Sequence, residues 1–236
     1  MSRVLPIFFN TDMVRAILDG RKTVTRRVIK PQPKMALSYI FAGCNYGKWN
    51  YPPKDAWEVS KWDEKYKWTE DMTKEDAGKT WNPPYHADDI IYVRETWQVY
   101  QTYPSAFGFD VAYRADQEIR PCIFSPERYE KFIKYENSKN YPRWISSQFM
   151  PKEAARIWLK VTGVRVERLQ DITAEQCIRE GVEKEALEVG EQFTRGIFNG
   201  IWDSTIKKPD LDCYGWNANP YVFVIEFERC EKPEIN

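Results

Sequence analysis

The chain has 236 residues and a mass of 28.1 kDa, which suits one domain or one domain with a large insertion. Its 42 % hydrophobic and 30 % charged residues exclude an intrinsically disordered chain. The 35 Lys and Arg side chains balance 35 Asp and Glu side chains, so any affinity for nucleic acid has to come from a local patch. No apolar run approaches the roughly 18 residues of a membrane helix, so we expect no membrane partner.

The residue inventory also limits the chemistry. Residues 4–9 form an apolar run with no small-residue cleavage site after it, so we expect a cytoplasmic protein. Five separated cysteines without a Cys-x-x-Cys pair, and the single histidine His86, argue against structural zinc and a disulfide framework. One histidine also disfavours a Ser-His-Asp or Cys-His hydrolase. We expect no metal or other cofactor, and chemistry that uses Lys, Thr, Tyr and carboxylates.

Basic residues concentrate in two segments. Residues 1–34 carry eight Lys and Arg against two Asp, and residues 142–168 carry six Lys and Arg against two Glu. If the two segments meet in the fold, a neutral protein gains a cationic face of the kind that phosphate backbones require. Charge counts alone favour the alternative, which is a solvated surface of mixed charge.

The first predicted element is a short helix over residues 11–20. Thr11 is the expected N-cap, Val14, Ile17 and Leu18 share one face, and Gly20 supplies a left-handed stop. The helix therefore delivers the chain directly into a basic segment, residues 21–27.

Residues 35–84 are predicted to be an insertion with little regular structure, because glycines and two Pro-Pro pairs interrupt them. Aromatic residues are frequent in the chain at 15 %, and such rings either pack a core or stack on bases. In the insertion they alternate with lysines, as Trp57, Lys61, Trp62, Lys65, Tyr66, Lys67 and Trp68. Acidic residues in the same stretch would repel a phosphate backbone, so we favour an insertion held together by its own tryptophans.

Runs rich in β-branched and aromatic residues predict strands at 90–94, 111–114, 156–161, 164–167 and 221–228. The last run is apolar at every position from Tyr221 to Ile225, so we expect a central strand that is covered on both faces. Few helices among several separate strands predict an α+β protein with a small mixed β-barrel and helices plugging its ends.

Two further helices are predicted in the C-terminal half. Thr173 and Gln176 form a capping box, and Gly181 ends the helix that follows it. Phe193, Ile197 and Ile201, spaced by four residues, mark the apolar face of another helix.

Lys22 and Thr25 attract attention because Arg21, Arg26 and Arg27 surround them directly after a helix stop. Crowded cations lower the pKa of a lysine toward the range in which a neutral amine acts as a base or nucleophile. Lys22 could then activate the Thr25 hydroxyl, provided that the chain bends between them. An exposed basic turn is the simpler explanation of the same residues, and these residues alone favour it.

Residues 17–27, followed by residues 89–97, resemble the ASCH domain, a PUA-like barrel. Met150-Pro151, residues 156–171 and residues 216–228 are similar to the larger ASCH proteins common in phages and prophages. The resemblance implies a single PUA-like domain over residues 1–236, with the insertion at about 35–84. It also implies a nucleic-acid role, since PUA-like barrels generally bind RNA or modified bases.

Small ASCH members share the Lys-x-x-Thr pattern and hydrolyse N(4)-acetylcytidine through a Lys, a Thr and a Glu. The resemblance thus implies the catalytic set Lys22, Thr25 and Glu180. Glu180 is matched through the helix that follows Leu169–Thr173, and a surface helix residue is an equal alternative for it. The expected RNA- or substrate-binding residues are Arg21, Arg26, Arg27, Arg94, Glu95 and Trp97. A buried Arg94-Glu95 pair that only orients the rim of the barrel is the simpler alternative for two of them.

Three functions follow in order of preference. The first is a module that binds RNA, a modified nucleoside or possibly DNA in a basic cleft near Lys22. The second is a metal-independent hydrolase, either an amidohydrolase on N(4)-acetylcytidine-like substrates or a ribonuclease. The third is a protein-interaction role in phage assembly or host takeover.

Overall fold

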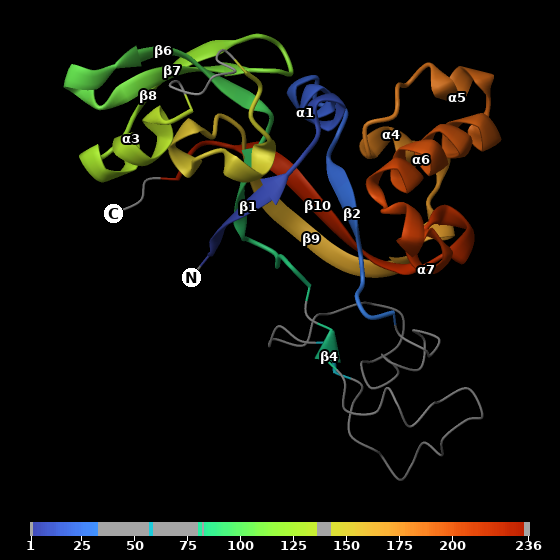
Figure 1. Ribbon diagram of the computed structural model, residues 1–236. Coiled ribbons are helices and arrows are strands. Elements are labelled where there is room, and N and C mark those ends of the chain that lie inside the picture. The colour runs from blue at the N-terminus through green and yellow to red at the C-terminus, as the bar shows by residue number, and fades with distance from the viewer. Residues whose placement is uncertain (1, 33–56, 59–79, 82, 136–142, 234–236) are drawn as a thin grey trace.

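The computed structural model describes residues 2–32, 57–58, 80–81, 83–135 and 143–233. A mixed five-stranded sheet forms its centre (Figure 1), in the order β1-β5-β9-β10-β2. These strands are β1 (Val4–Phe8), β5 (Ile90–Arg94), β9 (Trp158–Arg168), β10 (Tyr221–Cys230) and β2 (Val24–Val28). β1 runs parallel to β5, and the other three pairs are antiparallel.

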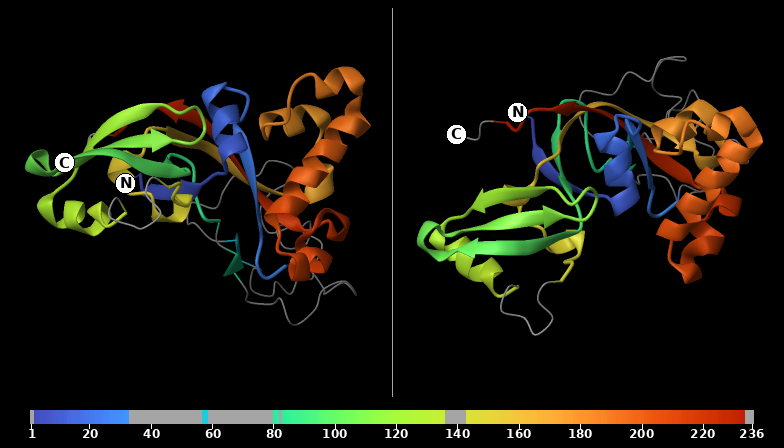
Figure 2. Two further views of the ribbon diagram at one scale, coloured as in Figure 1. Left: turned by 45° about the horizontal axis from the view of Figure 1, so that its top comes forward. Right: turned by 90° about the horizontal axis from the view of Figure 1, so that it is seen from above.

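A second, antiparallel sheet lies to one side of the first (Figure 2). It consists of β6 (Trp97–Tyr103), β7 (Gly108–Tyr113) and β8 (Ile119–Ile123), followed by α3 (Pro126–Ile133). Its own hydrophobic cluster is built around Trp97 and Phe109, which are fully buried. The five-stranded and the three-stranded sheet therefore have separate cores.

The predicted strands 90–94, 111–114 and 221–228 are confirmed within β5, β7 and β10. The two runs 156–161 and 164–167 form one continuous strand, β9, because Gly163 stays in the ladder opposite Glu226. β1, β2, β6, β8 and α3 were not predicted from the sequence.

Helix α1 (Thr11–Leu18) confirms the first predicted helix but not its cap. Asn10 is the N-cap, and its Oδ1 accepts a 2.9 Å hydrogen bond from the Met13 backbone N–H. Gly20 has φ +77°, as its predicted left-handed role requires. Val14 and Ile17 pack against the five-stranded sheet.

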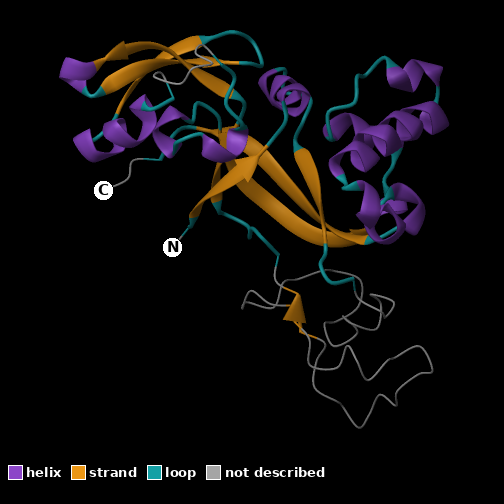
Figure 3. Cartoon of the chain, viewed as in Figure 1, coloured by secondary structure: helices purple, strands orange, loops and turns teal. Residues whose placement is uncertain are grey.

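The C-terminal helices lie at the opposite end of the five-stranded sheet from β6–β8 (Figure 3). They are α4 (Ala174–Arg179), α5 (Ala186–Val189), α6 (Glu191–Thr205) and α7 (Leu211–Tyr214). The Thr173–Gln176 capping box is present, with bonds of 3.2 Å and 3.1 Å. Short 3-10 turns occupy Pro104–Ala106, Ser147–Phe149, Lys152–Ala154, Leu169–Asp171, Lys208–Asp210 and Trp216–Ala218.

The buried face of α6 differs from the predicted one. Thr194, Phe198 and Trp202 are buried, whereas Phe193 is 50 % exposed. The same spacing of four is kept, but the face is displaced by one residue, because Phe198 and Trp202 are the larger pair that meets the neighbouring helices.

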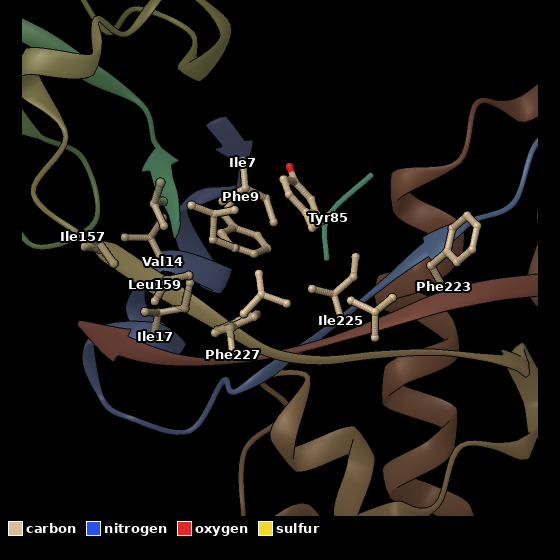
Figure 4. Packing of buried hydrophobic residues seen from close by; sticks show 14 of the residues in the cluster. Ile7, Phe9, Val14, Ile17, Tyr85, Ile157, Leu159, Phe223, Ile225 and Phe227 are labelled. Carbon is tan, nitrogen blue, oxygen red and sulfur yellow. The ribbon is translucent and has the colours of Figure 1, made fainter. Parts of the chain in front are cut away.

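Strand β10 confirms the prediction of a strand covered on both faces. Tyr221, Phe223, Ile225 and Phe227 join the cluster with α1 (Figure 4), and Val222 and Val224 join the cluster with α4–α6. Alternate side chains of one strand thus serve two cores. The same alternation decides on which face each residue of β2 lies.

The α+β class is confirmed, but the described strands form no closed barrel. β1 and β2 are the two edges of the five-stranded sheet, joined only by a side chain: Arg27 Nη2 donates to the Phe8 carbonyl oxygen, 3.1 Å away. The strands that could have completed a barrel, β6–β8, instead enclose the separate core around Trp97.

Most of the predicted insertion lies outside the described residues. Within it, β3 (Trp57–Glu58) and β4 (Thr80–Trp81) form a two-residue antiparallel pair. The proposed alternation of rings and lysines between residues 57 and 68 therefore lies outside what the structure describes. None of the described helices combines the length and the apolar character needed to cross a membrane.

Candidate functional site

Lys22 is placed at the edge of the sheet by the helix stop before it. Its backbone N–H donates to the Ala16 carbonyl oxygen, which turns the chain into β2. Its side chain is fully buried, and Nζ donates to Glu180 Oε2 at 2.7 Å, to the Glu180 carbonyl at 2.8 Å and to the Val24 carbonyl at 2.9 Å. All three ammonium donors are used, so the alternative of an exposed basic turn is wrong for Lys22.

Burial is the main cause that lowers the pKa of Lys22. The carboxylate of Glu180 opposes this effect, and the nearby Arg27 and Arg26 guanidinium groups add smaller lowering contributions. The predicted direction of the shift is thus confirmed, but crowding by arginines is only a secondary cause.

Glu180 follows the last residue of α4 and is buried. One carboxylate oxygen accepts from Lys22, and the other accepts from Arg26 Nη1 at 3.1 Å. Arg26 is fully buried as well, and its Nη2 donates to Gln176 Oε1 at 2.8 Å and to Glu167 Oε2 at 3.1 Å. The surface position considered for Glu180 is therefore wrong, and Arg26 holds this carboxylate instead of facing a ligand.

Thr25 lies on the other face of β2. It pairs with Ile225 in the ladder, and Arg27 pairs with Phe223, so both share the face of the cluster with α1. Arg26 pairs with Val224 and shares the helix face. Thr25 is buried, and among the described residues no hydrogen bond joins its hydroxyl to Lys22 or Glu180. The structure therefore brings Lys22 and Glu180 together, and it places Thr25 on the opposite face of β2 from Arg26, which binds Glu180.

A cavity of about 500 Å³ opens beside this face of β2. Phe223 lies beside β2 at one edge of the hydrophobic cluster, and Tyr85 lies next to Ile7 and Phe9 (Figure 4). The cavity is lined by Phe8, Arg27, Val28, Lys30, Pro84, Tyr85 and Phe223. The described part of its lining contains two cations, three aromatic rings and no carboxylate.

The cations and rings at this cavity are in contact with one another. The Arg27 guanidinium lies 5.5 Å from the Phe9 ring, and the Arg94 guanidinium lies 5.1 Å from the Phe8 ring. The Lys22 ammonium is 5.4 Å from the same Phe9 ring, on the buried side. Arg27 and Arg94, which were predicted as binding residues, therefore both reach the Phe8–Phe9 segment that borders the cavity.

Two other predicted binding residues, Arg21 and Glu95, have structural partners. Arg21 donates to the Gly181 carbonyl at 2.7 Å and forms ion pairs with Asp19 and Glu183. Glu95 is buried against Arg156, with Nε–Oε1 and Nη2–Oε2 distances of 2.9 Å and 3.0 Å, so it does not face a ligand, and the alternative of a pair with Arg94 is wrong as well. Burial raises the pKa of Glu95 in spite of this partner.

Trp97 is fully buried between aromatic rings of the second sheet. It stacks on Phe109 at 6.2 Å and meets Phe132 and Tyr135 edge-on. A ring in this position has no free face for a base, so the prediction of Trp97 as a binding residue is wrong.

The two basic segments do meet, but a carboxylate lies between them. Glu167 of β9 accepts from Arg26 at 3.1 Å and from Arg165 Nε, and Arg165 also bonds Glu226 at 2.5 Å. Each guanidinium is neutralised there, so this contact produces no cationic face. The cations that line the cavity, Arg27 and Lys30, belong to the first segment alone.

Phe8, Lys30, Tyr85 and Phe223 line the cavity but were not predicted as site residues. Only weak signals were available: an apolar run at residues 4–9 and the turn at Pro83-Pro84. Phe8 lies on β1, Phe223 on β10, and Lys30 and Tyr85 in loops, so no local pattern encodes their convergence.

The described residues contain no group of three or more His, Cys, Asp or Glu side chains that could hold a metal ion. Comparisons of the chain with family models, with curated proteins and with solved structures find no match. The functional inference therefore depends on the geometry above and on the resemblance of residues 17–27 and 89–97.

Proposed function

We propose that this chain is a cytoplasmic PUA-like protein of the ASCH type, which binds RNA or a modified nucleoside in the cavity beside β2. The single observation that carries the proposal is the lining of that cavity. Arg27 and Lys30 supply positive charge, Phe8 supplies a ring that is 45 % exposed, and the largely buried Tyr85 and Phe223 complete the wall, with no carboxylate among the described lining residues. Aromatic faces stack on unpaired bases while cations meet phosphates.

The volume is consistent with this ligand. About 500 Å³ falls within the range of cavities that enclose small organic molecules. Tyr85 is held rigidly, because its hydroxyl donates to the Pro6 carbonyl at 2.7 Å. A fixed ring beside a guanidinium binds a flat ligand at a lower entropic cost than a mobile one.

Titration with short RNA, short DNA and cytidine derivatives over a range of salt concentrations tests the proposal. We expect affinity for oligonucleotides to fall steeply as salt rises, because phosphate contacts release counterions. Arg27→Gln should weaken binding, and Tyr85→Leu should weaken it by about fivefold or more through lost stacking.

Arg229→Gln is the matched control for Arg27→Gln. Arg229 is exposed on β10, away from the residues that line the cavity. Equal loss of affinity in both variants would mean that binding is a general charge effect, and absence of any binding to RNA, DNA or nucleosides would refute the proposal.

The second candidate function is a hydrolase that acts on N(4)-acetylcytidine-like amides, or a ribonuclease. The observation that favours it is the buried Lys22–Glu180 contact together with the lowered pKa of Lys22. An amine that loses its proton more easily can take the proton of an attacking hydroxyl or water. In amide hydrolysis the acyl carbon gains that oxygen, the amide bond breaks, and cytidine and acetate leave.

Cytidine release from N(4)-acetylcytidine, and cleavage of a labelled RNA, test this candidate directly. We expect Lys22→Met and Thr25→Val to abolish turnover while the variants keep their fold. Thr23→Val is the control, because the Thr23 hydroxyl accepts a hydrogen bond from Arg179 on the surface and lies outside the proposed set. No product from either substrate at high enzyme concentration would leave the binding function alone.

A further inference from the structure

A second cavity, of about 620 Å³, lies on the exposed side of α6 and is not used by the proposed function. It is lined by Glu191, Gln192, Arg195, Gly196, Asn199 and Trp216. The five residues from α6 lie on one face of the helix. Glu191, Arg195 and Asn199 are spaced by four positions, and so are the adjacent Gln192 and Gly196. Trp216, from the 3-10 turn after α7, forms the facing wall.

The floor of this cavity is a glycine that the fold itself does not require. Gly196 lies in the middle of α6, where glycine weakens a helix relative to alanine. A methyl group added at Gly196 would meet nothing within 4 Å, and the φ of this residue is an ordinary one. Internal packing therefore requires a glycine neither here nor at Gly200, but only Gly196 lines the cavity, where the missing side chain leaves the helix backbone open to a ligand.

Arg195 adds an unsatisfied donor to the same place. Its Nη2 donates to the Gln170 carbonyl at 2.7 Å, and its guanidinium lies 5.8 Å from the Trp216 ring. Its Nε is buried and has no hydrogen-bond partner among the described residues. This Nε is inaccessible to solvent, so the part of Arg195 that a ligand in the cavity can meet is the rest of its half-buried guanidinium.

The remaining lining groups define the chemistry of that ligand. The Gln192 and Asn199 amides both donate and accept, and the Glu191 carboxylate accepts from exocyclic amines. Trp216 offers a flat apolar surface beside a guanidinium. Hydrogen bonds around the edge and stacking on the face together match a nucleobase.

Lys30 links the two cavities. It lines the cavity beside β2, and its ammonium lies 4.3 Å from the Tyr214 ring of α7, two residues before Trp216. Lys30 is exposed, and α7 lies beside the end of β2 in both views of Figure 2. We propose that the α6 cavity is a second nucleobase subsite, so that the protein binds an oligonucleotide whose intervening phosphate meets Lys30. This inference rests on the proposed function.

Filling the floor of the cavity tests the proposal. Gly196→Leu introduces a side chain into the open space and favours the helix, so the fold is retained. We expect this variant to bind an octameric oligocytidylate about tenfold more weakly than the parent chain, because one stacked base is lost. Its affinity for cytidine 5′-monophosphate, which occupies the cavity beside β2, should not change.

Gly200→Leu is the matched control. Gly200 lies one turn further along α6, is also exposed with nothing within 4 Å of an added methyl group, and does not line the cavity. The control should bind both probes as the parent chain does. Normal octamer binding by Gly196→Leu, or an equal loss of octamer affinity in the two variants, would overturn the second subsite. Binding of the monophosphate by the parent chain would still support the proposed function. If the parent chain bound neither probe, both proposals would fail.

Discussion

Lys22 Nζ and Glu180 Oε2 lie 2.7 Å apart although 158 positions separate these residues in the chain. Both side chains are almost fully buried, at 0 % and 5 % exposure, and Arg26 holds the second oxygen of the same carboxylate. The contact joins the edge of the five-stranded sheet to the end of α4. It therefore connects the candidate chemistry with the stability of the fold.

Removal of the shared carboxylate should be strongly destabilising. Glu180→Ala leaves the Lys22 and Arg26 charges buried without their common partner, which typically costs about 3–5 kcal/mol. Denaturant unfolding measures this cost. Glu183→Ala is the control, since Glu183 pairs with Arg21 at 3.0 Å but is 68 % exposed, and its loss should cost no more than about 1 kcal/mol. Similar losses in the two variants would contradict the assignment.

Gly181 should tolerate alanine less well than Gly20, although both have positive φ. Gly181 has φ +113°, and an added methyl group would lie 3.0 Å from the Ala16 Cβ and 3.7 Å from the Lys22 side chain. At Gly20, with φ +77°, the added group meets nothing within 4 Å. We expect Gly20→Ala to cost about 1 kcal/mol from backbone strain alone, and Gly181→Ala to cost clearly more. Equal unfolding midpoints would show that the Ala16 contact relaxes freely.

Trp97 should matter for stability and not for ligand binding. Trp97→Ala removes the ring between Phe109, Phe132 and Tyr135 and should cost about 3–5 kcal/mol. Under conditions in which the variant stays folded, its affinity for RNA should equal that of the parent chain. Ile123→Ala, at a side chain that is 70 % exposed on β8, should change stability by only about 0.5 kcal/mol. A specific loss of RNA affinity in Trp97→Ala would restore Trp97 to the site.

Buried thiols should make the protein less stable in alkali. Burial raises the pKa of Cys177 to about 12 from 9.0, so the folded state keeps a proton that the unfolded chain releases. Stability is therefore unaffected below pH 9 and falls as the pH rises from 9 toward 12. The unfolding free energy of Cys177→Ala should fall less over this range than that of the parent chain. It should still fall to some extent, because burial also raises the pKa of Cys122 to about 12. Cys213→Ala, which removes an exposed thiol, should follow the parent chain.

Local signals were sufficient for several elements. The cap at Thr173, the stop at Gly20 and the apolar run from Tyr221 to Ile225 were read correctly, because each depends on neighbouring residues alone. Edge strands were missed. β2 contains two arginines in five residues, and its pattern resembles an exposed turn until Glu180 and Glu167 neutralise Arg26.

The site was predicted in part. Lys22 and Glu180 were matched through the resemblance and are in contact, whereas Arg26 faces inward, Trp97 belongs to a core, and Tyr85 and Phe223 were not anticipated. A predicted charge becomes a ligand-binding group only if no carboxylate neutralises it. For Arg26 and Arg27, adjacent in sequence, that outcome depends on which face of β2 each side chain occupies.

The sequence by itself determined the α+β class, the helix stop at Gly20, the cap at Thr173 and the basic segment around Lys22, since capping, alternation and charge are properties of neighbouring residues. Only the tertiary structure decided that the sheet stays open and that Glu180 reaches Lys22. It also decided that a cavity with two cations and three rings forms beside β2. These features depend on the pairing of β2 with β10 and on the packing of α4 against that edge, which are contacts between residues far apart in the chain.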